Sequence, residues 1–347
     1  MSERPAGPKS GVSGAPSGVS GARADLRRFV GVSLGGGRGK TTAVARLELG
    51  PASDESGAES GGARSQLTLA EARTRWGQRG GGEIDDGDGD GEAPFRDAVL
   101  LRWIDRWVDE HTVTAFDTPL TLPPCVRCQL QCPGVEACTV PVVAWMRRHG
   151  EHLVIRKGRS DPGKPWVTPY TQRATELLLE RATLQPREAL GQGMGPLAAR
   201  AAYLRRALAP RLRLNENLIE VHPRATLIRL FGARLERRTR HGSAMQTWER
   251  RKDLLERLGQ LVEGLEFDRV WPDLVVRNVH VFHAVVSAFT AYFWAQESWC
   301  GPQDLLAKAE DQAGHLARAV DELGDLWLED GWIWAPPSRV PGTSSSD

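Results

Sequence analysis

Residues 113–123 read VTAFDTPLTLP, and the predicted fold is built outward from this stretch. A short apolar strand ends in Asp117, and Pro119 stops it directly afterwards. A second stretch, NLIEVHP at residues 217–223, again places an acidic residue, Glu220, in an apolar run that a proline ends. Open α/β sheets bind ligands at the carboxyl ends of their strands. Two carboxylates delivered in this way indicate a divalent-metal site for phosphate chemistry.

Asp117 also has a plainer interpretation, because an aspartate before Thr-Pro often caps the segment that follows. Glu220 suits that role less well, since glutamate is a poor cap. Glu220 and His222 are expected to share one face of their strand, because side chains alternate with a period of two. Ile219 and Val221 then take the other face, towards the core.

Charge is unevenly spread along the chain, although the 347 residues carry a formal net charge of only +1. Residues 79–93 form an acidic, glycine-rich insertion, and residues 200–257 are rich in arginine. A basic region balanced by an acidic loop is compatible with nucleic acid as a partner. The alternative is that the arginines lie on solvated helix faces, because no aromatic residues are interleaved with them.

Both ends of the chain are predicted to be disordered, at residues 1–24 and 339–347, around one domain at residues 25–338. The first segment is rich in Gly, Ser, Ala and Pro and lacks the apolar core of a signal peptide. The most apolar stretch, residues 279–295, is interrupted by polar residues and does not read as a membrane span. We therefore expect a cytoplasmic protein with no membrane partner.

A glycine-rich turn at residues 35–40 joins two predicted strands, residues 26–34 and 41–49, into a hairpin. A phosphate loop of the Walker type fits poorly, because Leu34 occupies the place of its first glycine and the segment after Lys40 reads as extended. The turn still offers backbone N–H groups and Lys40 to a phosphate. A flexible hairpin tip is the alternative.

The remaining pattern predicts a weak third strand at residues 67–69 and a hairpin with an Asp-Gly turn at residues 326–334. Apolar residues at helical spacing predict helices. These helices are expected near residues 95–110, 139–149, 171–183, 196–208, 223–232, 244–263, 279–295 and 303–323.

Four cysteines lie within fourteen residues, in the spacing Cys-x2-Cys-x3-Cys-x5-Cys: Cys125, Cys128, Cys132 and Cys138. Disulfides are rare in the cytoplasm, and four thiols satisfy the tetrahedral demand of zinc or of an iron–sulfur cluster. We therefore predict a metal, zinc ahead of iron–sulfur, with reduced thiols in a loop as the alternative.

The helix at residues 279–295 carries a polar stripe, because His280, His283, Ser287 and Thr290 recur on one of its sides. Buried polar groups need partners. The site around Asp117 would supply those partners. A histidine in the core that is satisfied by its neighbours is the alternative interpretation.

Taken in order, these motifs resemble the family called domain of unknown function 429. The resemblance rests on FVGVSLGG at residues 29–36, FDTPL at 116–120, IEVHP at 219–223 and the small-residue helix around His283. It spans roughly residues 28–335. The family is similar to nucleases of the ribonuclease-H-like superfamily. The resemblance implies an α/β fold with a mixed sheet, in which an antiparallel three-strand meander is followed by two parallel strands, flanked by helices.

The same resemblance implies a nuclease site in which Asp117 and Glu220 match the family. Members usually carry an aspartate on the first strand, where this chain has Ser33, and often one in the last helix, where it has His283. Two carboxylates hold two Mg²⁺ ions poorly, and His283 favours a softer metal such as Mn²⁺ or Zn²⁺. The cysteine cluster is outside the pattern of the family.

The function that follows is a metal-dependent nuclease with Mg²⁺ or Mn²⁺ held by Asp117 and Glu220, and with His222 or His283 as third ligand or proton carrier. Four residues are expected to contact the phosphate and the nucleic-acid backbone: Ser33, Lys40, Arg251 and Lys252. The first alternative is a non-catalytic nucleic-acid-binding or regulatory protein on a nuclease-like fold. An actin-like ATP phosphotransferase ranks last, because its second glycine-rich loop has only residues 191–195 as a candidate.

Overall fold

The structure of the protein is a computed structural model that describes most of the chain between residues 23 and 337. The described residues are 23, 25–36, 41–51, 65–76, 92–155, 165–191, 193–262, 264–268, 270–297, 299–306 and 314–337. Four sequence predictions fall wholly or largely outside them: the N-terminal tail apart from Arg23, Lys40, nearly all of the acidic insertion, and the C-terminal tail.

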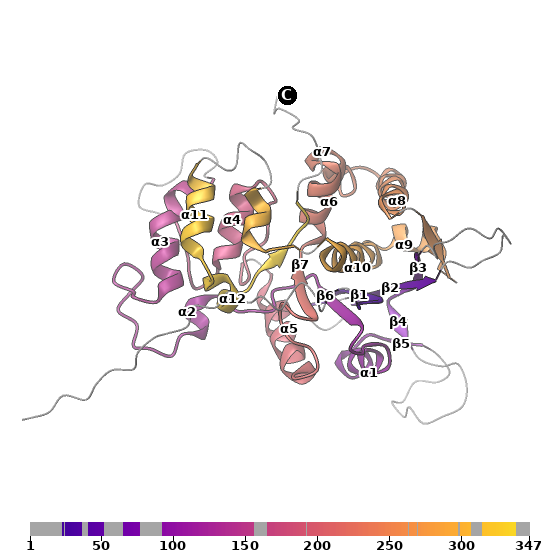
Figure 1. The fold of residues 1–347 in the computed structure, drawn as a ribbon, viewed down its shortest axis with the longest axis horizontal. Helices are drawn as coiled ribbons and strands as arrows, with labels where there is room; N and C mark the ends of the chain where they lie inside the picture. Colours follow the sequence, from indigo (N-terminus) through magenta and orange to yellow (C-terminus); the bar gives the residue numbers. More distant parts are fainter. Residues whose placement is uncertain are drawn as a thin grey trace, which may run out of the picture.

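A seven-stranded mixed sheet forms the centre of the protein, in the order β8-β3-β2-β1-β6-β7-β9. The meander is formed by β1 (Arg28–Ser33), β2 (Ala43–Pro51) and β3 (Ser65–Arg73), each antiparallel to the next. The strands β6 (Thr112–Phe116) and β7 (Leu218–Val221) then run parallel to β1 (Figure 1). The predicted combination of an antiparallel meander and parallel strands is therefore confirmed.

Two short strands extend this sheet at its edges, and the sequence did not predict them as such. One edge is β8 (Leu265–Phe267), parallel to β3, and the other is β9 (Ile333–Trp334), parallel to β7. Both have too few residues for an alternating pattern to be visible in the sequence. A separate pair is formed by β4 (Arg75–Trp76) and β5 (Ala93–Pro94).

Helices cover both faces of the sheet. The helix α10 (Val279–Gln296) lies on one face, and α1 (Asp97–Trp107) and α5 (Gly195–Leu208) lie on the other (Figure 1). Strand residues alternate accordingly, since Phe29 belongs to the core cluster of the α10 face and Val30 to that of the opposite face. The strands are buried on both faces, which explains their nearly continuous apolar sequences.

Gly31 brings α10 unusually close to the sheet. A Cβ atom at this position would lie 1.9 Å from the carbonyl oxygen of Ala284 and 2.5 Å from the backbone nitrogen of Ala288. Only glycine on β1 and small residues on α10 permit this contact. The close packing sets the position of the N-terminal turns of α10 relative to the end of β1.

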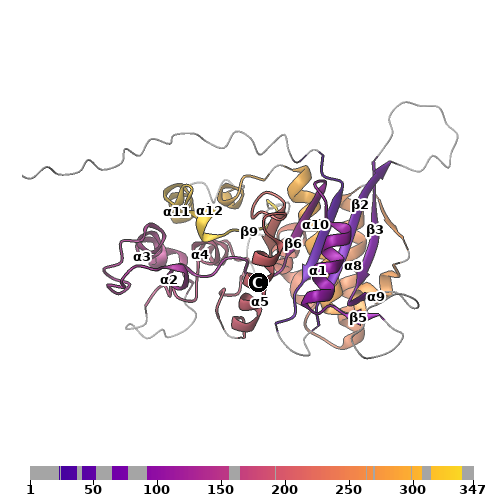
Figure 2. The ribbon, with the colours of Figure 1, turned by 90° about the horizontal axis from the view of Figure 1, so that it is seen from below.

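The other helices form two groups. Beside α10 lie α6 (Pro223–Phe231), α7 (Ala233–Arg238), α8 (Ala244–Leu261) and α9 (Pro272–Arg277). Beyond β9 lie α2 (Pro124–Arg127), α3 (Pro141–Leu153), α4 (Ala174–Arg181), the 3-10 helix η1 (Pro302–Leu306), α11 (His315–Leu323) and α12 (Leu326–Asp330). Figure 2 shows α2, α3, α4, α11 and α12 as a group beside the sheet. No helix of the described segments is both long and apolar enough to cross a bilayer.

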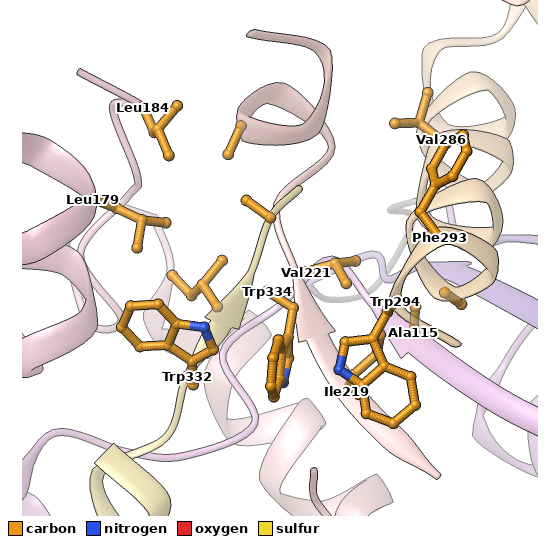
Figure 3. Packing of buried hydrophobic residues seen from close by; sticks show 14 of the residues in the cluster. Ala115, Leu179, Leu184, Ile219, Val221, Val286, Phe293, Trp294, Trp332 and Trp334 are labelled. Atoms are coloured by element: carbon orange, nitrogen blue, oxygen red, sulfur yellow. The ribbon is translucent and has the colours of Figure 1, made fainter. Parts of the chain in front are cut away.

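The predicted hairpin at residues 326–334 is wrong. Residues 326–330 form α12, and β9 follows and pairs with β7 instead of folding back on its own neighbour. The reason is tertiary packing, because the ring of Trp334 lies 5.7 Å from that of Trp294 and 5.8 Å from that of Trp327. Figure 3 shows Trp334 in the core between Trp332 and Trp294.

One further boundary also differs from the prediction. Arg23 was assigned to the disordered tail, but its side chain is buried and donates to the carbonyl oxygens of Trp294 and Trp299. Its guanidinium lies 3.8 Å from the centre of the Trp294 ring, a cation–π contact.

Candidate functional site

Asp117 follows the last residue of β6 and is held by the end of β1. Its backbone N–H donates to Val32, and its Oδ1 atom accepts from the backbone N–H of Leu34 at 2.9 Å. The hydroxyl of Ser33 also hydrogen-bonds to the carboxylate. Burial raises the pKa of Asp117 to about 6, although these bonds and the charge of Arg187 oppose the rise. The side chain remains partly accessible, so Asp117 is a carboxylate in a recess at the sheet edge.

His222 follows the last residue of β7 and forms the N-cap of α6. Its Nε2 atom is buried and has no hydrogen-bond partner among the described residues. The ring does bond to the backbone of Gln185, which leaves Nε2 as the nitrogen without a partner. Burial lowers the pKa of His222 to about 4, and the charges of Arg224 and Arg187 lower it further. The imidazole is therefore neutral at pH 7 and offers one nitrogen to a ligand.

His283 lies in the second turn of α10, close to His222. Burial lowers the pKa of His283 to about 3, and the charges of His222, His280 and Arg251 act in the same direction. The residues of the predicted polar stripe therefore have two different surroundings. His283 faces the sheet edge near His222, whereas Thr290, farther along α10, hydrogen-bonds to Thr226 at 2.8 Å inside the core.

Arg187 connects these groups, and no sequence motif pointed to it. It lies between α4 and α5, is exposed, and its charge shifts the pKa of Asp117, His222 and His283. The paired ends of β6 and β7 bring Asp117 and His222 to one edge of the sheet, and the charge of Arg187 acts on both and on His283. The loop that carries Arg187 is strained, because Thr183 and Gln185 have φ angles of 62° and 48°. Strained non-glycine residues gather at functional sites, so this loop is a candidate part of the site.

Glu220 does not join that site. It pairs in register with Phe116, so Asp117 lies one residue beyond it along the sheet. A step of one residue turns a side chain to the opposite face of a sheet. Asp117 therefore lies on the α10 face, and Glu220 lies on the face covered by α5. His222 was expected to share a face with Glu220, but it lies beyond the end of β7, where the alternation no longer applies, and it is near His283 of α10.

The carboxylate of Glu220 is fully engaged. Arg173 donates to its Oε2 atom at 2.8 Å and to its Oε1 atom at 2.6 Å, and the backbone N–H of Leu120 donates to Oε2 at 2.8 Å. Arg173 is completely buried and also binds Glu176, whose pKa burial raises to about 7. Glu220 is thus an acceptor in a buried ion cluster, and a role as metal ligand beside Asp117 is not supported.

The residues that were predicted to contact phosphate lie in different parts of the structure. Ser33 joins the site through Asp117. Arg251 is buried and donates to the carbonyl oxygen of Val276 at 2.9 Å. Its charge also contributes to the lowered pKa of His283. Lys252 lies elsewhere, in a pocket of about 740 Å³ beside Phe267 and Trp271, and pairs with Asp273. The structure therefore does not bring Lys252 together with Asp117 and His222.

The base of the glycine-rich turn is fixed next to the site. Arg200 on α5 donates to the carbonyl oxygen of Gly35 at 2.6 Å and to the hydroxyl of Thr42 at 2.8 Å. That hydroxyl also accepts from the backbone N–H of Gly35 at 3.0 Å. Both ends of the turn are therefore held together at the carboxyl end of β1.

The arginine-rich region is used mainly for internal contacts. Its ion pairs include Arg200 with Asp97, Arg211 with Asp105, Arg224 and Arg240 with Glu236, and Arg257 with Asp253. Arg234, Arg237 and Arg238 on α7 are exposed and have no ion pair within the described segments. Exposed arginines such as these remain available for an external anion.

None of the five cysteines forms a disulfide. Among the described residues, no three His, Cys, Asp or Glu side chains are already arranged as a metal-binding group. Metal binding at the cysteines and at Asp117 therefore stays a prediction.

Comparison with known proteins assigns the chain to a family without assigning an activity. No protein of curated function and no solved structure matches it. The pattern of one family, described as protein of unknown function (DUF429), matches residues 84–306, which include β6, β7 and α10. The match covers more than half of the chain and leaves out the strand that carries Ser33. The chain is thus a member of the DUF429 family.

Proposed function

We propose that this protein is a metal-dependent phosphodiesterase that acts on nucleic acid, with Asp117, His222, His283 and Arg187 at its site. The strand order β3-β2-β1-β6-β7, with a meander followed by parallel strands, supports a ribonuclease-H-like sheet of the kind that the sequence resemblance implies. In such a sheet the ligand binds at the carboxyl ends of the parallel strands. Asp117 and His222 each follow the last residue of such a strand.

One observation carries the proposal, namely that Arg187 acts electrostatically on Asp117, His222 and His283 together. Guanidinium groups bind phosphate oxygens through directed, charge-assisted hydrogen bonds. Arg224 and Arg240 add positive charge near His222. An anion would relieve the repulsion among these groups, so a phosphate is the ligand that the charge distribution favours.

The donor set fits Mg²⁺ or Mn²⁺ better than zinc. Mg²⁺ is commonly held by one or two carboxylates, and water and substrate phosphate oxygens complete its shell. Asp117 supplies one carboxylate, and the single lone pair of the unpartnered His222 Nε2 is kept for the water that attacks the phosphate. A bound cation of this kind polarises the phosphodiester and lowers the pKa of a water molecule.

The residues of the chain have separate tasks in the reaction. Arg187 binds and orients the phosphate, and its exposed position allows it to move with the substrate. Asp117 must be deprotonated to act, so activity should fall as the pH drops below about 6. The Nε2 atom of neutral His222 accepts a hydrogen bond from the attacking water and thereby orients it. Ser33 and the Leu34 N–H hold the Asp117 carboxylate in position.

The second candidate is a non-catalytic nucleic-acid-binding protein on the same sheet. Two observations favour it. The described residues contain no three-ligand metal group, and the strand β1 carries Ser33 at the place where the resemblance implies an aspartate. In this alternative, Arg187, Arg224 and Arg240 bind the backbone, and Asp117 only secures the end of β1.

The test combines cleavage and binding. Single- and double-stranded RNA and DNA are incubated with the full chain and Mg²⁺, Mn²⁺ or no metal, using the wild type, Asp117→Asn and Asp105→Asn. Asp105 is exposed and pairs with Arg211, so it serves as the matched control. We expect metal-dependent cleavage by the wild type and by Asp105→Asn, and none by Asp117→Asn. If no protein cleaves with any metal and Asp117→Asn still binds as tightly as the wild type, the second candidate is correct.

A further inference from the structure

Outside the Asp117 site, α2 and the segment that leads from it to α3 carry four of the five cysteines. Cys125 lies in α2 and Cys128 is its C-cap, so the two thiols are separated by one helical turn. Cys132 and Cys138 follow before α3 begins. Cys125 and Cys138 are partly buried against the core, whereas Cys128 and Cys132 are exposed.

The base of this loop is fixed by backbone hydrogen bonds. The N–H of Cys125 donates to Pro169 at 3.1 Å, and that of Cys128 donates to Pro124 at 3.0 Å. From α3, Arg147 donates to the carbonyl oxygens of Val135 and Cys138 at 2.8 and 3.3 Å. The first and last cysteines are therefore held in place, and the exposed pair lies on the segment between them.

The first and last cysteines pack on the same part of the protein. The side chains of Cys125 and Cys138 both contact the main core cluster, and Cys128 lies one helical turn from Cys125. Cys132 lies on the exposed segment between Cys128 and Cys138. A divalent cation offsets the mutual repulsion of thiolates, so four thiols on one short segment are a ligand set that a metal can bring together.

We propose that Cys125, Cys128, Cys132 and Cys138 bind one structural zinc ion. Four thiolates meet the tetrahedral demand of a closed zinc site, with no ligand position left for a substrate. Because no three side chains of the described residues form a metal group as they stand, Cys128 and Cys132 must turn inward on binding. Both are exposed, so this movement disturbs no core packing.

The expected consequence reaches the loop that follows Asp117. Arg127, between the first two cysteines, donates to the carbonyl oxygen of Leu122 at 2.7 Å and to the carboxylate of Asp330 at 2.6 Å. Asp330 in turn accepts from the backbone N–H of Ala174 at 2.7 Å, at the start of α4. A zinc ion would therefore stabilise α2 together with the segment that leads away from the sheet edge. This inference is independent of the proposed nuclease activity.

The test measures metal content and thiol reactivity of the full chain, purified without chelator. We compare the wild type, the double variant Cys128→Ser/Cys132→Ser and the control Cys300→Ser, whose thiol is remote in sequence and exposed. We expect about one zinc ion per chain in the wild type and the control, and less than about a tenth of that in the double variant. Four thiols should resist modification until a chelator is added.

Cobalt(II) provides a second measurement on protein from which the metal has been removed. It should give the intense visible bands of tetrahedral thiolate coordination in the wild type, and zinc should abolish them. Metal-free, folded wild type with five reactive thiols after incubation with zinc would overturn the proposal. Disulfides in the purified protein, or iron with the brown colour of a cluster, would overturn the zinc assignment as well.

Discussion

Asp117 and Glu220 lie on neighbouring parallel strands, and their surroundings differ in almost every respect. Glu220 is buried, binds both terminal nitrogens of Arg173 and accepts from the Leu120 N–H. Asp117 has no arginine bound to it directly in the described structure, keeps some accessible surface, and has a pKa raised to about 6. Two acids in similar sequence contexts therefore differ, because one is neutralised by an arginine inside the protein and the other has no such partner among the described residues.

The difference predicts the largest effect for Glu220. Glu220→Gln leaves Arg173 buried without its full counter-charge, and breaking a buried ion pair costs about 3–5 kcal/mol. The free energy of unfolding, measured in urea, should fall by that amount. Glu216→Gln is the matched control, because Glu216 is exposed and pairs only with Arg213 at the surface. Equal stability of the two variants would show that the Arg173 cluster does not hold the fold together.

Substitution of Asp117 is expected to raise the free energy of unfolding, whereas substitution of Glu220 lowers it. The difference between a pKa of about 6 and the ordinary 3.8 corresponds to about 3 kcal/mol. Because the pKa of the folded state is raised, the stability due to Asp117 is full below pH 3.8 and is lost as the pH rises through 6. Asp117→Asn removes this cost, and weakened hydrogen bonds offset about 1 kcal/mol.

Asp117→Asn should therefore be more stable than the wild type by about 2 kcal/mol at pH 8, with no gain at pH 3.5. Urea unfolding at both pH values checks this, with Asp105→Asn as the control. A loss of stability at pH 8 would place Asp117 in the same structural class as Glu220.

Arg187 tests whether the Asp117 site receives an anion. Arg187→Ala should leave stability unchanged, because the residue is exposed, but should weaken nucleic-acid binding by about 1–2 kcal/mol and reduce its salt dependence by about one ion. Fluorescence anisotropy with a labelled oligonucleotide at several salt concentrations measures both. Arg213→Ala removes an exposed arginine just before β7, at the opposite end of that strand, and should bind as the wild type does.

The smallest effect is expected at Ser33. Its hydrogen bond lowers the pKa of Asp117, so Ser33→Ala should raise that pKa by less than about 1 unit, the equivalent of one hydrogen bond. If the protein cleaves nucleic acid, the acidic limb of its pH–rate profile should move upward in the variant. A limb that stays in place would separate activity from the ionisation of Asp117.

Much of the fold was accessible from the sequence. The meander, the parallel strands predicted at residues 113–116 and within 217–223, and the long helix predicted at residues 279–295 have clear apolar patterns, and the structure contains all of them. The short strand β8 was not predicted, because three residues carry no pattern. Residues 333–334 were predicted to pair within a hairpin, but β9 pairs with β7, beside the contact of Trp334 with Trp294 in the core.

The sequence by itself determined that acidic residues stand near the ends of two strands and that histidines recur along one helix. Only the tertiary structure decided which of them share a site. The register of β6 against β7 places Asp117 and Glu220 on opposite faces, and Arg173, which neutralises Glu220, comes from 47 residues away in the chain. Arg187 reaches the Asp117 site from a loop with no recognisable motif. Local patterns in the sequence specify the strands. The offset of one residue between the two carboxylates in the sheet, and an ion pair with a distant arginine, decide which carboxylate has no arginine partner among the described residues.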